Sequence, residues 1–161
     1  MSSKLIQKIR QGKFTSAIKI LLNGEYNPDE LDNILLVISK NGFAVSTDLF
    51  DICLGLKSYS EEALSLVLFE ISLVGSEKEI IKLLELGANI NYSMTETNTG
   101  IAYGDSLKKT VFEAYLIHTY IPAVSSKIIS IMFSYGAKIS YNEYNSLLRA
   151  IRYYESDVID L

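Results

Sequence analysis

The chain has 161 residues, of which 48% are hydrophobic and 21% are charged, and its formal net charge is −4. This composition is typical of a folded domain or a short repeat array, and it excludes a disordered chain, which would be poor in apolar residues. One cysteine (Cys53) and one histidine (His118) exclude an intramolecular disulfide, a thiol-clustered metal site and every motif that needs two histidines. We therefore expect neither a metal nor a cofactor.

The charge is distributed unevenly along the chain. Residues 1–24 carry +5, residues 25–105 carry −10 and residues 106–161 carry +1. Nucleic acid is disfavoured as a partner, because phosphate binding needs an extended basic surface. The acidic middle segment is either an ordinary solvated face or a surface that attracts a basic protein by long-range steering.

Signals for secretion and for membrane insertion are weak. The basic N-terminal segment, residues 1–13, is not followed by the apolar run of a signal peptide. The most apolar stretch, residues 114–137, is interrupted by His118, Pro122 and Lys127, and its pattern predicts two helices joined by a bend. We therefore expect an intracellular, cytoplasmic protein with no membrane contact, or one that acts inside a host cell.

Helices are predicted over most of the chain. Apolar residues recur at helical spacing in residues 5–9, 17–22, 31–38 and 49–56. Residues 31–38 and 63–74 are apolar on nearly all sides, so helices there must be covered by neighbours on most faces. The middle layer of a stack of helices provides such an environment.

Helix starts are marked by capping residues. Residues 27–30 (Asn-Pro-Asp-Glu) combine an N-cap, a proline in the first turn and an acid at the third position. Residues 76–79 form a Ser-x-x-Glu capping box, and acids follow Thr47, Ser60 and Ser156. These signals predict short helices separated by short connections.

One stretch, residues 91–109, lacks helical periodicity and is rich in Thr, Asn, Gly and Ser. Residues 98–100 (Asn-Thr-Gly) predict a turn between short strands at residues 92–97 and 101–103. A β-hairpin is expected there.

Two segments share one pattern: residues 79–91 and 127–140 each run as an apolar helix followed by Gly-Ala, a polar residue, Ile and a polar residue. Residues 17–24 are a fainter copy that ends at a glycine. This pattern resembles the second helix of the ankyrin-repeat family, whose period is 33 residues. Residues 110–115 and 145–150 stand where the family has its first helix, although they lack the proline and histidine of its motif.

The resemblance implies an all-α, ankyrin-like helical-hairpin solenoid that forms a single domain over residues 1–161, with one enlarged β-hairpin finger near residues 91–109. The predicted units cover residues 1–27, 28–59, 60–92, 108–141 and 142–161, with an insertion at 92–107. The alternative fold is another kind of helical-hairpin solenoid, which would imply the same function.

The resemblance also implies a protein–protein interaction module whose concave face and finger bind a protein partner. Short, divergent ankyrin-like proteins of this composition resemble viral and bacterial antagonists or immunity proteins in host–pathogen interaction, so an inhibitor or decoy is expected. The alternative is an adaptor or scaffold segment of a longer ankyrin-repeat protein, because residues 156–161 resemble the opening of a further helix.

Candidate contact residues come from the finger and from the tyrosine-rich end of the chain. Nine of the eleven tyrosines follow residue 91, and tyrosine is enriched at interfaces, although it also fills half-buried positions in helical proteins. The predicted partner-binding residues are Tyr92, Thr95, Glu96, Asn98, Tyr103, Asp105, Tyr115, Tyr144, Arg149 and Arg152.

No enzymatic activity is expected. His118 lies in an apolar helical segment, and Glu113 is five residues earlier, which places the two on different helix faces. Cys53 stands between Ile52 and Leu54, where a small buried apolar residue is expected.

Overall fold

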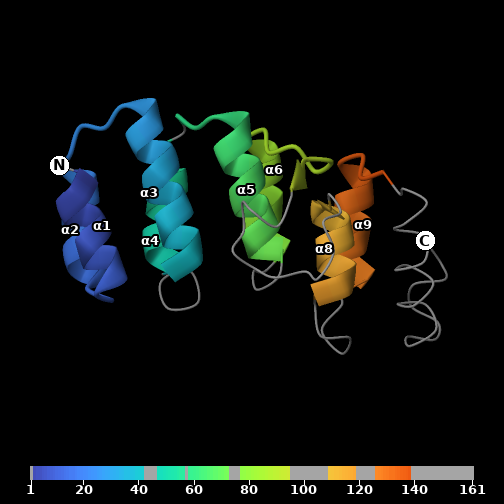
Figure 1. Ribbon diagram of the computed structural model, residues 1–161, viewed down its shortest axis with the longest axis horizontal. Coiled ribbons are helices and arrows are strands. Elements are labelled where there is room, and N and C mark those ends of the chain that lie inside the picture. Colours follow the sequence, from blue (N-terminus) through green and yellow to red (C-terminus); the bar gives the residue numbers. More distant parts are fainter. Residues whose placement is uncertain are drawn as a thin grey trace. The chain divides into compact units, whose positions relative to one another are not determined.

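The computed structural model (Figure 1) describes residues 2–41, 47–56, 58–72, 77–94, 109–118 and 126–138. In these residues the fold is all-helical apart from one short pair of strands, which agrees with the predicted all-α class. The chain divides into two compact units, residues 1–88 and 89–161.

The first unit is built from three helix pairs that follow one another along the chain (Figure 1). Its helices are α1 (Ser2–Arg10), α2 (Phe14–Leu22), α3 (Pro28–Asn41), α4 (Thr47–Leu54), α5 (Glu61–Ser72) and α6 (Glu77–Glu85). The two helices of a pair run in opposite directions, and α3 packs against α1, α4 and α5. Each pair therefore shields the apolar face of its neighbour.

The core of the first unit is centred on α3 and α5, as their apolar character on nearly all sides predicted. Both helices bury side chains around most of their circumference: Leu31, Ile34, Leu35, Val37 and Ile38 in α3, and Ala63, Leu64, Val67, Leu68, Phe69 and Ile71 in α5. Three serines are buried with them, and each donates its hydroxyl to a carbonyl oxygen one turn earlier in its helix. The buried hydroxyls therefore remain hydrogen-bonded.

The capping signals before α3 and α5 are confirmed. Asn27 Oδ1 accepts a hydrogen bond of 2.9 Å from the backbone N–H of Glu30, and Glu30 Oε2 accepts one of 3.3 Å from the N–H of Asn27. Ser60 Oγ accepts a bond of 3.1 Å from the N–H of Ala63. Thr47 is the first residue of α4, and Ser76 and Ser156 lie outside the described residues.

The second unit contains α8 (Val111–His118), α9 (Ser126–Ser134) and the strands β1 (Ser93–Met94) and β2 (Lys109–Thr110). The two helices pack through Phe112 and Phe133, whose ring centroids are 5.1 Å apart. This arrangement agrees with the two helices predicted within residues 114–137, although α8 starts earlier.

The structure describes the predicted strands only in part. β1 lies inside the predicted strand 92–97, but its antiparallel partner is β2, with Ser93 opposite Thr110 and Met94 opposite Lys109. Thr110 also caps α8, because its Oγ1 accepts a 3.2 Å bond from the N–H of Glu113. A capping residue adopts extended backbone angles, so the same residue can end a strand and start a helix. Residues 95–108, which include the predicted turn, lie outside the described residues.

Among the described helices, none combines the length and the apolar character that crossing a membrane requires.

Candidate binding surface

The two copies of the Gly-Ala pattern have the same backbone geometry. Gly87 and Gly136 have φ angles of 103° and 82°, in the left-handed region that favours glycine. The N–H of Ala88 donates to the carbonyl of Leu83, and that of Ala137 donates to the carbonyl of Met132, both at 3.0 Å. This is the Schellman arrangement, which satisfies the last carbonyls of α6 and of α9.

In the second unit, Asn91 holds two loops together. Its Nδ2 donates to the carbonyl of Gly136 at 3.0 Å, and its Oδ1 accepts a 2.8 Å bond from the N–H of Lys138. The N–H of Asn91 donates to Asn89 Oδ1 at 3.0 Å, which fixes the turn before β1. One amide side chain therefore sets the spacing between the turn at residues 89–91 and the loop after α9.

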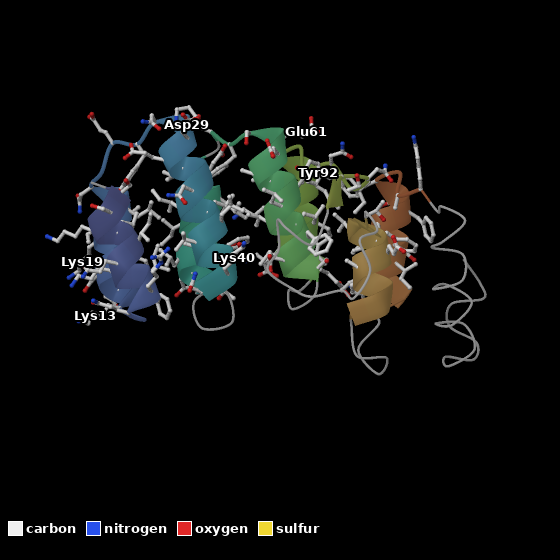
Figure 2. The ribbon with its side chains drawn as sticks, in the orientation of Figure 1. Lys13, Lys19, Asp29, Lys40, Glu61 and Tyr92 are labelled. Carbon is white, nitrogen blue, oxygen red and sulfur yellow. The ribbon has the colours of Figure 1, made fainter. Side chains whose placement is uncertain are left out.

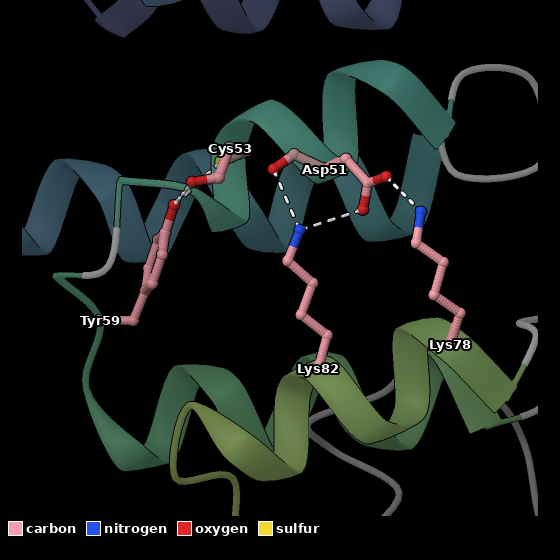
Figure 3. Close-up of polar contacts among 5 residues, drawn as sticks. All are labelled: Asp51, Cys53, Tyr59, Lys78 and Lys82. Carbon is pink, nitrogen blue, oxygen red and sulfur yellow. Dashed lines mark hydrogen bonds and ion pairs between the residues drawn. The ribbon is translucent and has the colours of Figure 1, made fainter.

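The loops after α2 and α4 are closed by tyrosines. Tyr26 Oη donates to the carbonyl of Ile20 at 2.9 Å, and Tyr59 Oη donates to the carbonyl of Cys53 (Figure 3). The residues that follow these tyrosines, Asn27 and Ser60, cap the next helices. Each Tyr-cap dipeptide thus ties the end of one helix to the start of the next.

The sequence contains a regular tyrosine spacing that indicates these closed loops, and our predictions did not use it. Tyr26, Tyr59 and Tyr92 are spaced 33 residues apart, and each is followed by Asn or Ser. This spacing equals the period of the ankyrin family. A tyrosine that closes its own loop has a structural role, so the shared spacing favours such a role for the half-buried Tyr92 as well.

Cys53 is fully buried, as predicted, and its Sγ lies 3.2 Å from Tyr59 Oη. Burial raises the pKa of the thiol from 9.0 to about 11, although the hydrogen bond with Tyr59 opposes this rise. Burial also raises the pKa of Tyr59, and the proximity of Cys53 adds to that effect. Both groups are therefore protonated and unreactive near neutral pH.

The second helices of two successive pairs are linked by Asp51, which is in α4 (Figure 3). Its Oδ2 lies 2.7 Å from Lys78 Nζ and its Oδ1 lies 3.2 Å from Lys82 Nζ, both on α6. The hydrogen bond from Lys78 is the main cause of the lowered pKa of Asp51. Beside these lysines, α6 lines a shallow, open hollow with Glu77, Lys78, Ile81, Lys82 and Glu85. This hollow lacks the enclosure of a small-molecule site.

Acidic side chains gather at one end of the helix pairs of the first unit, where α2 and α4 end and where α3 and α5 begin. Figure 2 shows Asp29 and Glu61 at this end. We call it the acidic edge; its carboxylates are Glu25, Asp29, Glu30, Asp32, Glu61 and Glu62. Two of them have structural roles, because Glu30 completes a capping box and Asp32 Oδ1 accepts a 3.0 Å bond from the N–H of Ser60. Glu25, Asp29, Glu61 and Glu62 are exposed.

Of the ten predicted contact residues, the structure describes two. Tyr92 is half-buried and directly precedes β1. Tyr115 is only 1% exposed and packs in the core of the second unit, so its side chain does not present a contact surface. The apolar periodicity around it, in residues 111–117, is the signal that indicated a core position. The other eight lie outside the described residues: Thr95, Glu96, Asn98, Tyr103, Asp105, Tyr144, Arg149 and Arg152.

No group of three or more His, Cys, Asp and Glu side chains that could hold a metal ion occurs in the described part of the chain. His118 is the last residue of α8.

Comparisons with known proteins gave no match: no family model, no curated protein and no solved structure is significantly similar to the chain.

Proposed function

We propose that this chain is a protein–protein interaction module with an ankyrin-like solenoid architecture. The observation that carries the proposal is the repeated loop geometry at Gly87 and Gly136, where one short pattern recurs with the same backbone conformation and the same hydrogen bonds. The successive helix pairs and the 33-residue spacing of Tyr26, Tyr59 and Tyr92 support the same architecture. Stacked repeats present extended surfaces, and such surfaces are suited to recognising proteins.

The proposed role is that of an inhibitor or decoy that covers a surface of its partner, in the manner of a viral or bacterial antagonist. The acidic middle of the chain favours a basic partner, and the insertion at residues 92–107 is the proposed finger. The proposal assigns no reaction, no cofactor and no nucleic acid to the chain, and places it inside a cell. An adaptor without inhibitory activity is the competing function.

Affinity capture with the full chain as bait, followed by mass spectrometry, tests the proposal. The matched bait replaces residues 95–105 with a Gly-Ser segment of the same length, and circular dichroism verifies that its helicity is retained. We expect a protein that the full chain captures and the replacement variant loses. Capture that is equally strong with both baits would contradict the role of the finger.

The inhibitor and the adaptor are distinguished by the activity of the captured partner. An inhibitor lowers that activity in proportion to occupancy, whereas an adaptor leaves it unchanged. Failure of both baits to capture any protein would overturn the proposal of an interaction module.

A further inference from the structure

The first helix pair, α1 and α2, carries positive charge only. Residues 1–24 contain no aspartate and no glutamate. The bases of the pair are Lys4, Lys8, Arg10, Lys13 and Lys19, of which Lys8 is half-buried and the others are exposed. A helix of nine residues is about 13 Å long, so these cations are held on a small part of the first unit. We call α1, α2 and the turn between them the basic pair.

The cations of the basic pair have no anionic partner in the part of the chain that the structure describes. None of their side chains forms an ion pair or a hydrogen bond there. In contrast, Lys40, Lys78 and Lys82 each lie within 4.0 Å of a carboxylate oxygen. The positive charge of the basic pair is therefore not neutralised by the described residues.

Helix electrostatics explains only some of these charges. Lys8 and Arg10 are in the last turn of α1 and Lys19 is in the last turn of α2, where the helix dipole favours a cation. Lys4 is in the first turn of α1 and Lys13 is the N-cap of α2, where a cation is disfavoured. The helices α3, α4, α5 and α6 all have acids in their first turns instead. Such departures from local stability rules are expected at functional surfaces.

One side of the basic pair is open within the first unit. α1 packs against α2 and α3, and α2 packs against α1 and α4, so the neighbouring pair covers a single side. Figure 2 shows Lys13 and Lys19 on the side that is turned away from α3. Leu22 follows Lys19 by three residues on α2, which places it on the same helix face, and it is 62% exposed. The open side thus combines cations with an exposed apolar side chain.

We propose that the basic pair docks a short acidic protein segment. The carboxylates of this segment lie near the cations of α1 and α2, and one of its apolar side chains contacts Leu22. The inference goes beyond the proposed function, because it gives the chain a second surface whose charge preference is opposite to that of the acidic middle.

Size and charge select this occupant over others. A segment of about six extended residues spans roughly 20 Å, which is enough to cover the basic pair. An anionic membrane or a nucleic acid duplex is more extended, and it would approach Glu25 and Asp29, which follow α2 and repel it. A second copy of the chain is a poorer match, because carboxylates such as those of Asp32, Asp51 and Glu70 already have partners.

The test uses a short fluorescent peptide of alternating Glu-Glu and Leu-Leu pairs, with fluorescence anisotropy as the readout of its binding to the full chain. Two control peptides replace every glutamate with lysine or every leucine with serine. We expect the Glu-Leu peptide to bind most tightly, with an affinity that falls several-fold as the salt concentration rises from about 50 to about 300 mM. Equal or tighter binding of the Lys-Leu peptide would overturn the proposal.

Matched variants locate the site. Lys4→Gln/Lys13→Gln removes two cations from the basic pair, and Lys127→Gln/Lys138→Gln removes two exposed cations from the second unit. We expect the first variant to lose about tenfold in peptide affinity and the second to lose less than about twofold. Equal losses would show a nonspecific response to net charge and would overturn the proposal.

The stability of the same variant provides an independent measurement. Because the helix dipole disfavours both cations, we expect Lys4→Gln/Lys13→Gln to keep or raise the midpoint of thermal unfolding while it loses affinity. A lowered midpoint would show that these charges support the fold, and it would overturn the proposal. Leu22→Ser changes no charge and should weaken peptide binding several-fold. Unchanged affinity of this variant would overturn the apolar part of the proposal.

Further measurements separate this inference from the proposed function and from other occupants. Replacing residues 95–105 with a Gly-Ser segment should leave peptide binding unchanged, whereas a loss would place the peptide on the finger and overturn the inference. Tighter binding of phosphatidylserine vesicles or of duplex DNA than of the Glu-Leu peptide would also overturn it. So would self-association, measured by sedimentation, that Lys4→Gln/Lys13→Gln abolishes. The peptide assay does not use the captured partner, so either proposal can fail while the other stands.

Discussion

The loops after α2 and α4 differ from the loops after α6 and α9, although each loop follows the second helix of a pair. In the first two, Tyr26 and Tyr59 donate their hydroxyls to carbonyls of the preceding helix. In the other two, the left-handed Gly87 and Gly136 satisfy the last carbonyls with backbone N–H groups. The chain therefore ends its second helices in two ways, one through a side chain and one through the backbone.

The difference explains two glycines that look equivalent in the sequence. Gly24 ends the faint copy of the repeat pattern, and Gly87 ends the strong copy. Gly87 has a φ of 103° with open space around its α-carbon, so its backbone conformation requires glycine. Gly24 is not in the left-handed region, but a Cβ there would overlap the ring of Tyr26. Gly87 is therefore needed for its backbone conformation, whereas Gly24 is needed because it leaves room for the Tyr26 ring.

The largest expected effect is an alkaline loss of stability at Cys53, whose thiol lies beside the hydroxyl of the loop-closing Tyr59. The pKa of Cys53 is raised from 9.0 to about 11 in the folded state, so its contribution is fully present below about pH 9 and is lost as the pH rises through 11. We expect the free energy of unfolding, measured with urea, to fall by roughly 2–3 kcal/mol over this range.

Cys53→Ala is the control for this prediction, since it removes the thiol and should flatten the fall between about pH 9 and 11. Tyr59→Phe should reduce the further loss above about pH 10, because burial raises the pKa of that hydroxyl too. A variant lacking Cys53 that loses stability as steeply as the parent chain would contradict the assignment.

The second-largest loss of stability is expected at Gly24, where an added side chain would overlap the ring of Tyr26. Gly24→Ala forces the ring of Tyr26 away from Ile20, which removes a hydrogen bond and packing area, and we expect a loss of about 2 kcal/mol in urea unfolding. In a Tyr26→Ala background the same change should be neutral or slightly stabilising, because alanine restricts the unfolded chain. An additive double-mutant cycle would refute the steric explanation.

The sequence predicts those features of the fold that depend on neighbouring residues better than those that join distant segments. Capping at Asn27 and Ser60, the burial of α3 and α5 on most sides, and the burial of Cys53 follow from short patterns, and the structure confirms them. The pairing of β1 with β2 joins residues on either side of residues 95–108, and no local pattern specifies that register.

The candidate surface was less predictable than the fold. Tyr115 was proposed as a contact because tyrosine is common at interfaces, yet its helix buries it, and residue type alone does not report burial. The acidic edge, in contrast, combines the starts of α3 and α5, which are distant in sequence. The sequence contains its charges, but only the packing of α3 on α5 brings them to one end.

The left-handed backbone conformation of Gly87 predicts a smaller loss of stability than the one expected at Gly24. Gly87→Ala places a Cβ in the left-handed region, and we expect it to cost about 1 kcal/mol in urea unfolding. Gly87→Asn should recover part of that loss, because asparagine tolerates this conformation better than alanine does. No side chain lies within 4 Å of the added Cβ, so Tyr92→Ala should not rescue Gly87→Ala. If Tyr92→Ala did rescue Gly87→Ala, both kinds of loop would depend on a tyrosine ring. That result would contradict the distinction between loops closed by a side chain and loops closed by the backbone.

The smallest effect is expected at Asn91, which supports the glycine-closed loops from outside the helices. Asn91→Ala removes the bonds to Gly136 and Lys138, but these backbone groups are near solvent, and water replaces the lost partner. We expect a loss below about 1 kcal/mol, together with faster amide exchange at Lys138 than at Ala137. The Ala137 N–H keeps its bond to Met132 within the glycine motif, so it serves as the internal control. Equal acceleration at both amides would mean that Asn91 maintains the helix end itself, and that the backbone alone does not close this loop.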